Sequence, residues 1–395
     1  MAEPCSTDIV IIGGGVAGLW LLNRFRDAGY HAVLLESGEV GGGQTLMSQG
    51  IIHGGLKYAL DGQLGQATKT IAAMPDRWRG LLAGKGEIDL SGTKVLSPQY
   101  YMWSGGGMRS RLKTFLGSKS LRGRVDVVEP ENYPEGFRRC TVAGTLYQLP
   151  DFVLDTPSLL ANLLAHHGDY VYRYDKSRLS FTLDAQGNVS GIEIQGESPV
   201  RITAKRVILC AGQGNTALIN QAGLQTIKGQ LRPLKMLSLS KPHLPSLYVH
   251  CIGADFSLTP RITLTTHQDE QGNSVFYLGG ELAEAGVGKP DEDLIATASK
   301  ELAGSVPWVD LEGAVWRCHE VNRAEASTAS GHRPDEAFHA EENNVIVAWP
   351  TKLTLCPALG DSLLQHVQQS FQGEATSQHL PLPAASAGNQ PWDQL

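Results

Sequence analysis

Six residues near the N-terminus, Gly13-Gly14-Gly15-Val16-Ala17-Gly18, follow the pattern GxGxxG. The β-branched run at residues 8–12 just before them predicts a buried parallel strand. Between such a strand and a helix, Gly13 permits a tight turn and Gly15 lets a pyrophosphate approach the backbone. Gly18 lets the helix pack close to the strand. The arrangement predicts a dinucleotide-binding site.

The elements around this motif support the same interpretation. Residues 16–28 have the apolar spacing of a helix, and residues 31–36 predict a second buried strand. The free amides of Val16 and Ala17 at the helix N-terminus favour a bound phosphate. Glu36 ends the second strand, where its carboxylate can accept hydrogen bonds from a ribose and repels a 2′-phosphate. The acidic residue therefore argues against NADP.

A polar, glycine-rich loop follows the second strand before any new helix begins. Such a loop can wrap the ribityl chain and the pyrophosphate of a second nucleotide half, which favours FAD over NAD. The loop residues expected to contact the cofactor are Ser37, Gln44, Thr45, Ser48, Gln49 and Gly50.

Two segments of the chain match known flavoproteins. Residues 53–58, His-Gly-Gly-Leu-Lys-Tyr, are similar to the His-Gly-Gly-Leu-Arg-Tyr segment of flavin-dependent glycerol-3-phosphate dehydrogenases, and residues 351–354, Thr-Lys-Leu-Thr, are similar to their Gly-Lys-Leu-Thr segment. Weaker matches lie at residues 154–159, 207–212 and 331–335. The chain thus resembles the superfamily of D-amino-acid oxidase and glycerol-3-phosphate dehydrogenase from residue 8 to about 371. It departs by carrying Lys57 where the dehydrogenases carry Arg, and by lacking their C-terminal extension.

The resemblance implies non-covalent FAD, a two-domain fold and oxidation of a C–H bond beside oxygen or nitrogen. The expected class is α/β (α+β overall), with a Rossmann-like FAD-binding domain and a second, mainly antiparallel β substrate domain. Alternating strands such as residues 261–266 and 275–278 suit the second domain. The expected FAD-binding domain is discontinuous, at residues 1–80, 150–228 and 323–380, the substrate domain comprises residues 81–149 and 229–322, and residues 381–395 form a loose tail.

A second group of residues is expected at the flavin. Flavin reduction leaves negative charge near N1 and C2=O, which a site must stabilise. Pro357 suits the first turn of a helix over residues 357–371, with Thr354 or Cys356 as its cap, so that the helix dipole and Lys352 face this edge. The expected cofactor contacts here are Ala211, Gly212, Thr351, Lys352, Leu353 and Thr354.

Histidines are the candidates for a general base, because an alcohol substrate must lose its hydroxyl proton. His53 lies on the loop expected over the flavin, and a rival role for it is covalent attachment of the flavin. His267 and His319 lie in or beside predicted strands of the substrate domain. A structural role is the ordinary alternative for each of the latter two.

An anionic substrate needs a fixed cation, and arginine binds carboxylate or phosphate well. Arg323 falls where related enzymes have a Gly-x-Arg-Pro element at the substrate pocket, so it is the first candidate, and Lys57 is the second. Arg333 lies in a family-like turn, and for Arg232 and Arg261 a surface salt bridge is the default.

Composition limits the partners. The net charge of −7 on 395 residues, with no basic stripe, argues against nucleic acid. Six scattered cysteines without a CxxC pair or metal spacing fit reduced thiols in a cytoplasmic protein. The N-terminus lacks a basic secretory region, and the apolar run at residues 9–22 is too short to span a bilayer. Peripheral contact with a membrane stays open.

The leading hypothesis is an FAD-dependent dehydrogenase or oxidase that acts on a small, anionic CH–OH compound such as a hydroxy acid or polyol phosphate. Its electrons pass to a quinone, oxygen or another acceptor. The alternatives are an amino-acid or amine oxidase of the same fold and, from another class, a flavin-binding protein without catalysis. An NAD-dependent dehydrogenase does not account for the C-terminal flavin-edge segment.

Overall fold

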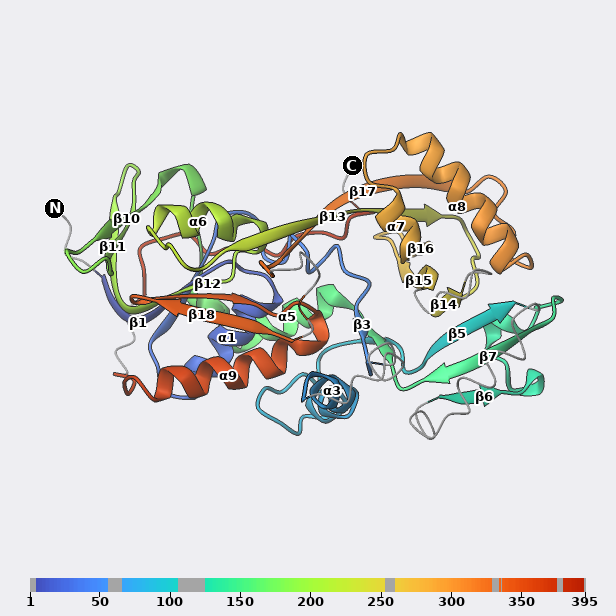
Figure 1. Cartoon of the computed structure of the whole chain (residues 1–395), viewed down its shortest axis with the longest axis horizontal. Coiled ribbons are helices and arrows are strands. Elements are labelled where there is room, and N and C mark those ends of the chain that lie inside the picture. Colours follow the sequence, from blue (N-terminus) through green and yellow to red (C-terminus); the bar gives the residue numbers. More distant parts are fainter. Residues whose placement is uncertain are drawn as a thin grey trace.

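The computed structural model describes residues 5–55, 66–105, 125–252, 260–328, 334, 336–374 and 379–393, and the side chains of residues 66 and 67 are not included. Lys57 and Arg333 therefore lie outside the described residues. Within them, the chain forms two eight-stranded sheets and one three-stranded sheet (Figure 1). None of the helices seen in these ranges has the length and apolar character needed to cross a bilayer.

The first sheet contains the predicted nucleotide-binding strands. Its order is β10 (Leu179–Leu183), β11 (Val189–Ile194), β12 (Val200–Leu209), β1 (Cys5–Ile12), β2 (Ala32–Glu36) and β9 (Val171–Arg173), with β19 (Val345–Trp349) on β12 and β18 (Phe338–Glu342) on β19. The pairs of β1 with β12 and β2, of β12 with β19, and of β2 with β9 are parallel. The strands expected from continuous apolar runs are thus confirmed.

Helices cover both faces of this sheet because its strands are apolar on both sides. Ile9 and Ile11 pack toward the helices α1 (Val16–Asp27), α3 (Gln66–Leu82), α5 (Thr156–His167) and α9 (Cys356–Gln368). Val10 and Ile12 alternate with these residues along β1, so they point to the opposite face of the sheet. There they pack in the same hydrophobic cluster as residues of α6 (Asn215–Gln221). This alternation follows from the two-residue period of a strand.

The second sheet is mainly antiparallel. Its order is β17 (Val315–Ala326), β13 (Gly229–Ser240), β16 (Ser274–Gly279), β15 (Pro260–Gln268), β14 (Val249–Ile252), β5 (Tyr100–Gly105), β7 (Gly144–Leu149) and β6 (Asp126–Val128), with only the β14–β5 pair parallel among these. Leu282 of α7 (Glu281–Ala285) and Leu294 and Leu302 of α8 (Asp291–Ser305) pack on one face, against the apolar side chains of β13, β15 and β16. The expected fold class is confirmed.

The third sheet contains β3, the strand that directly precedes His53. It pairs β3 (Ile51–Ile52) with β8 (Phe152–Leu154) and β8 with β4 (Val95–Ser97). Short 3-10 turns complete the described chain, at Pro130–Asn132, Glu135–Phe137, Gly168–Tyr170, Lys176–Arg178, Gly212–Gly214 and Leu353–Leu355. Figure 1 shows the long strands β13 and β17 running from the part that contains β12 and α6 to the part that contains β15 and β16. The expected boundary between residues 322 and 323 falls inside β17, and the domain division itself stays a prediction.

Residues 379–393 are packed rather than loose, contrary to expectation. We call residues 379–393 the C-terminal strap. Val40 donates its backbone N–H to Ser386 and accepts one from Gly388, next to the loop after β2. At the other end Trp392 is 6% exposed, and its ring lies 5.1 Å from that of Tyr277 in the second sheet. Proline and alanine in this segment suggested disorder, but the single buried tryptophan anchors it.

Replacing Trp392 with alanine should lower the free energy of unfolding by about 3 kcal/mol, because truncating a buried aromatic side chain leaves a cavity. Urea denaturation followed by circular dichroism measures this change. Ser386→Ala is the matched control, since its side chain is exposed and its backbone bond to Val40 is kept. Equal stability of the two variants would mean that the strap does not pack in solution as described.

Candidate functional site: a dinucleotide cradle and a histidine–aspartate pair

The first glycine turn has room for no side chain at two positions. Gly13 has a φ of +117°, and a Cβ there would lie 2.6 Å from the backbone of Cys210 and Ala211. A Cβ on Gly18 would lie 1.9 Å from the carbonyl oxygen of Gly13. Both contacts are far shorter than van der Waals distances, so glycine is required for β1, α1 and β12 to approach one another.

Glu36 closes one side of this turn. Its Oε2 accepts the backbone N–H of Gly14 at 2.5 Å, and its Oε1 accepts that of Gly38 at 2.7 Å. The carboxylate therefore lies at the carboxyl end of β2 beside the glycine turn. This position fits the ribose-binding role expected from the sequence.

The backbone amides at the N-terminus of α1 lie beside the same glycine turn. Gly15 is the N-cap and provides no side-chain cap, while the N–H of Val16 donates to Thr45 Oγ1 at 3.0 Å. The amides of Ala17 and Gly18 lie in the first helical turn, where N–H groups have no intrahelical acceptor. Together with the helix dipole they suit a pyrophosphate.

The loop after β2 joins the cradle to the second sheet. Gln44 Oε1 accepts the N–H of Ala324 in β17 at 2.9 Å, and Ser48 Oγ donates to the carbonyl oxygen of Thr45. Gln49 Nε2 donates to the carbonyl oxygens of Thr263 and Tyr277, both at 2.9 Å. Gln44 and Gln49, which the sequence predicted as cofactor contacts, are seen in the structure to link the loop to the second sheet.

Other turns complete the cradle. Gly50 and Gly212 have positive φ angles of 69° and 55°. Ala211 donates its N–H to Asn215 Oδ1 at 2.7 Å, which fixes the turn after β12. Ser37 follows Glu36 directly at the end of β2. The glycine turns, the helix N-terminus and the acidic residue meet at one edge of the sheet, so the chain fits a bound dinucleotide.

The expected flavin-edge segment is strained at its start. Thr351 has a φ of +65°, and its Oγ1 donates to the carbonyl oxygen of Glu336 at 2.7 Å. Lys352 comes next and leads into the 3-10 turn Leu353–Leu355. The N-cap of α9 is Leu355 without a side-chain cap, so the expectation that Thr354 or Cys356 caps this helix was wrong.

Thr354 instead connects this segment to His53. Its Oγ1 accepts the backbone N–H of His53 at 2.9 Å, and its carbonyl oxygen accepts Trp78 Nε1 at 2.9 Å. Thr354 is fully buried. The segment before α9 and the loop after β3 are therefore joined by a hydrogen bond at His53.

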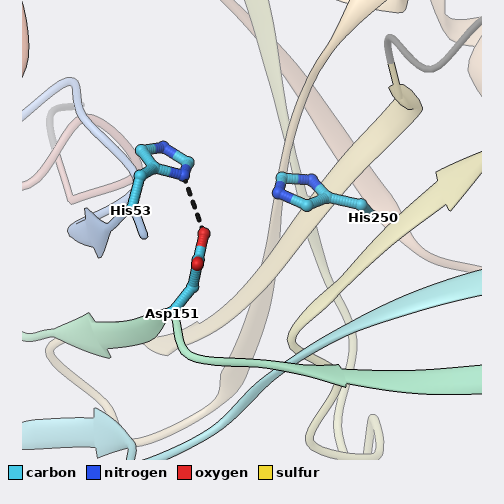
Figure 2. Close-up of side chains that lie close together, drawn as sticks. All are labelled: His53, Asp151 and His250. Carbon is cyan, nitrogen blue, oxygen red and sulfur yellow. Dashed lines mark hydrogen bonds and ion pairs between the residues drawn. The ribbon is translucent and has the colours of Figure 1, made fainter. Parts of the chain in front are cut away.

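His53 pairs with a buried carboxylate. Its Nδ1 lies 3.1 Å from Oδ2 of Asp151, whose side chain is 4% exposed, while the side chain of His53 is 35% exposed (Figure 2). Asp151 Oδ1 accepts the backbone N–H of Gly54 at 2.8 Å. Both oxygens of the carboxylate are thus engaged, and Oδ2 holds the imidazole of His53 in one orientation.

His250 of β14 is the third member of this cluster. Its ring is parallel to that of His53 within 8°, with centroids 6.1 Å apart, and its Nδ1 lies 3.0 Å from Thr263 Oγ1. The pKa of His250 is lowered to about 3, mainly by burial and also by charge on His53, while Asp151 opposes the shift.

Asp151 and His250 were missed by sequence reasoning. A polar histidine between Val249 and Cys251 of an apolar strand was the one available signal. No local pattern shows which carboxylate it meets.

The two other candidate histidines lie elsewhere. His267 is 3% exposed, its Nε2 lies 2.8 Å from Thr265 Oγ1, and its ring packs 4.7 Å from that of Trp392. His319 Nε2 lies 2.8 Å from Ser238 Oγ. Burial lowers the pKa of His267 to about 3 and is the main cause that lowers the pKa of His319 to about 4. The structure does not bring either one to the His53–Asp151 pair.

Arg323 lies in β17 and forms an ion pair with Glu284, with 3.2 Å between Nη2 and Oε1. Its cross-strand neighbour Arg232 pairs with Glu325, and Arg261 pairs with Glu301. The surface salt bridges expected for Arg232 and Arg261 are therefore present, although Glu325 itself is buried. Arg323 as an anion clamp stays a prediction.

Comparisons with known proteins show the family of the chain. The model of the family described as FAD dependent oxidoreductase matches residues 8–365. A probable FAD-dependent oxidoreductase of Pseudomonas aeruginosa is 43% identical over 384 residues, covering 97% of this chain and 96% of that protein. The crystal structure of that oxidoreductase has a TM-score of 0.85 at 38% identity and covers 100% of this chain and 99% of its own.

More distant structures share the fold. Glycine oxidase from Geobacillus kaustophilus has a TM-score of 0.63 at 16% identity, covering 98% of this chain and 100% of its own. The L-α-glycerophosphate oxidase of Mycoplasma pneumoniae, solved with FAD bound, has a TM-score of 0.67 at 13% identity, covering 95% and 97%. At these identities the likeness concerns the fold alone.

Replacing Gly18 with alanine should abolish cofactor binding, because the new Cβ would collide with Gly13 and displace the helix N-terminus. Gly43→Ala, in the loop that follows β2, is the control, since a Cβ there meets no atom within 4 Å. The wild type and the control should purify yellow and release FAD into the supernatant after acid precipitation. A yellow Gly18→Ala variant would contradict the cradle, and colour in the acid pellet would contradict non-covalent binding.

The buried histidines should make the protein labile to acid. The pKa of His267 is lower in the folded chain than the ordinary 6.5, so the unfolded state binds more protons between about pH 6.5 and 3. Stability is then fully present above pH 6.5 and falls by up to about 1.4 kcal/mol per pH unit below it for this group.

The change that checks this is His267→Phe, which keeps the ring and removes the titrating nitrogen. Its unfolding free energy, from urea titrations between pH 7.5 and 4.5, should depend less steeply on pH than that of the wild type. The exposed His166→Gln should leave the slope unchanged. Identical slopes in all three proteins would rule out His267 as a source of acid lability.

Proposed function

Because the chain belongs to the family of FAD-dependent oxidoreductases, we propose that it oxidises a CH–OH group of a small molecule, with His53 as the general base. The observation that carries the proposal is the 3.1 Å contact between His53 Nδ1 and the buried Asp151 carboxylate. A carboxylate at Nδ1 favours the tautomer whose hydrogen is on Nδ1 and whose lone pair is on Nε2. The Nε2 atom is then the proton acceptor.

The chemistry of an alcohol explains why such a pair is useful. A hydroxyl proton must leave as the carbonyl forms, whereas an amine can arrive already neutral. Bound FAD supplies the two-electron acceptor for the hydride. His53 accepts the hydroxyl proton, and Asp151 stabilises the positive charge that forms on the imidazole, as in other histidine–carboxylate pairs.

The substrate that we propose is a hydroxy acid or a polyol phosphate. Arg323 supports this class, because its pair with Glu284 is exposed and such pairs contribute about 0–1 kcal/mol. A substrate carboxylate or phosphate can therefore compete for the guanidinium. Lys57 is the second cation that we propose, and Lys352 would stabilise negative charge on the reduced flavin. An amine or amino acid is the alternative substrate, for which the pair of His53 and Asp151 would be dispensable.

Replacing Asp151 with asparagine or His53 with glutamine should slow anaerobic flavin reduction by about 10²–10⁴-fold with an alcohol substrate. The substrate is sought first by mixing the yellow protein with panels of hydroxy acids, polyol phosphates and amino acids and following loss of flavin absorbance. His166→Gln, on the exposed end of α5, is the control and should reduce at the wild-type rate.

Two results would reject the base assignment. One is an alcohol that reduces the His53→Gln and wild-type flavins equally fast. The other is reduction by amino acids alone, with no rate change in the Asp151→Asn variant, which would favour the amine alternative. Bound FAD is quantified in each variant, so that loss of cofactor is not mistaken for loss of the base.

A further inference from the structure

His53, Asp151 and His250 meet from three separate segments of the chain. His53 follows β3, Asp151 precedes β8, and His250 lies in β14, and Figure 2 shows their side chains pointing toward one another. One potential ligand atom from each of the three lies within 4.8 Å of the others. Ligand atoms around one tetrahedral zinc ion lie about 3.4 Å apart. Side-chain rotations that move each of the three atoms by roughly 1 Å would therefore bring them to the separation that zinc requires.

The donor atoms select a particular kind of metal. Two imidazole nitrogens and one carboxylate oxygen suit zinc and similar transition metals, whereas magnesium and calcium prefer oxygen ligands. Three protein ligands also leave a fourth position for water or another small ligand. The partial exposure of His53 gives an ion access from solvent.

The groups behind the ligands are of the type found around bound metals. Nδ1 of His250 is already engaged by Thr263 Oγ1, which leaves Nε2 as the nitrogen available to an ion. Oδ1 of Asp151 accepts the N–H of Gly54, which leaves Oδ2 on the side of His53. Such outer hydrogen bonds orient metal ligands and raise their affinity.

We propose that His53, Asp151 and His250 form a zinc-binding site whose occupation switches off the general base. The binding of zinc is independent of the proposed oxidation. The inhibition by zinc, in contrast, rests on the proposed role of His53 in that oxidation. Zinc takes the lone pair of His53 Nδ1, in place of the hydrogen that this atom donates to Asp151. The hydrogen of the neutral ring then resides on Nε2, having moved there through solvent, so that Nε2 no longer accepts a proton. The substrate and flavin sites stay formed, but proton removal stops.

The binding test uses zinc chloride and the purified yellow protein, in competition with a chromophoric zinc chelator. The wild type should bind one zinc ion per chain, and His250→Gln should bind it at least 100-fold more weakly. Thr263→Val removes only the outer hydrogen bond and should weaken binding by about 10–100-fold. His166→Gln should bind zinc as the wild type does, and magnesium chloride should not compete.

Failure of the site and failure of the proposed function can be told apart. Absence of zinc binding, or equal binding by the wild type and His250→Gln, overturns the site even if His53→Gln still slows flavin reduction. If zinc binds as expected, it should stop flavin reduction by the alcohol in the wild type, and EDTA should restore it. Zinc bound at this site without inhibition overturns the tautomer switch. If His53→Gln leaves reduction unchanged, the base assignment fails while the binding result stands.

Discussion

Gly13 brings the end of β1 so close to Cys210 and Ala211 that any side chain there would lie 2.6 Å from their backbone. This close approach aligns the carboxyl ends of β1, β2 and β12 along one edge of the parallel sheet. The N-terminus of α1 and the carboxylate of Glu36 then face the same space. A single steric constraint on the backbone thus assembles the groups that a pyrophosphate and a ribose require.

From this edge, the loop after β2 reaches the second sheet through polar contacts as well as the apolar packing of Met47. Gln49 donates to two backbone carbonyls of β15 and β16, and Gln44 accepts a backbone N–H of β17. Buried backbone groups at a sheet face need partners, and these amides provide them. The loop is consequently held at its middle and near its end, and β3 and His53, which directly follow it, take a defined position. The C-terminal strap adds a second connection, with Trp392 packed on Tyr277.

Asp151 orients the imidazole ring of His53. Burying a carboxylate is costly unless its oxygens are hydrogen-bonded, and here the backbone of Gly54 and the ring of His53 meet that need. The same engagement that stabilises the carboxylate orients the imidazole. Because His250 approaches the pair from β14, the second sheet contributes to a site whose other members belong to loops around the third sheet. The position of His250 thus depends on how the sheets pack together.

The sequence by itself determined the parts of this protein that depend on neighbouring residues. The glycine turn, Glu36 and the strands around them obey short-range rules of steric allowance and apolar period, and the predicted strands at residues 8–12 and 31–36 match β1 and β2. Motif resemblance added the FAD and the family, which short-range rules do not supply.

Only the tertiary structure decided which distant side chains meet. Asp151 lies 98 residues from His53 in sequence, and their contact depends on the pairing of β3 with β8. His267 was a weaker candidate than His53 in sequence, and in the structure Trp392 of the strap packs against its ring. The strap itself resembled a loose tail because its composition is polar and proline-rich, whereas backbone hydrogen bonds and the buried side chains of Leu380 and Trp392 hold it in place. Such contacts have no local signal, because they arise from the packing of sheets that are assembled from remote segments.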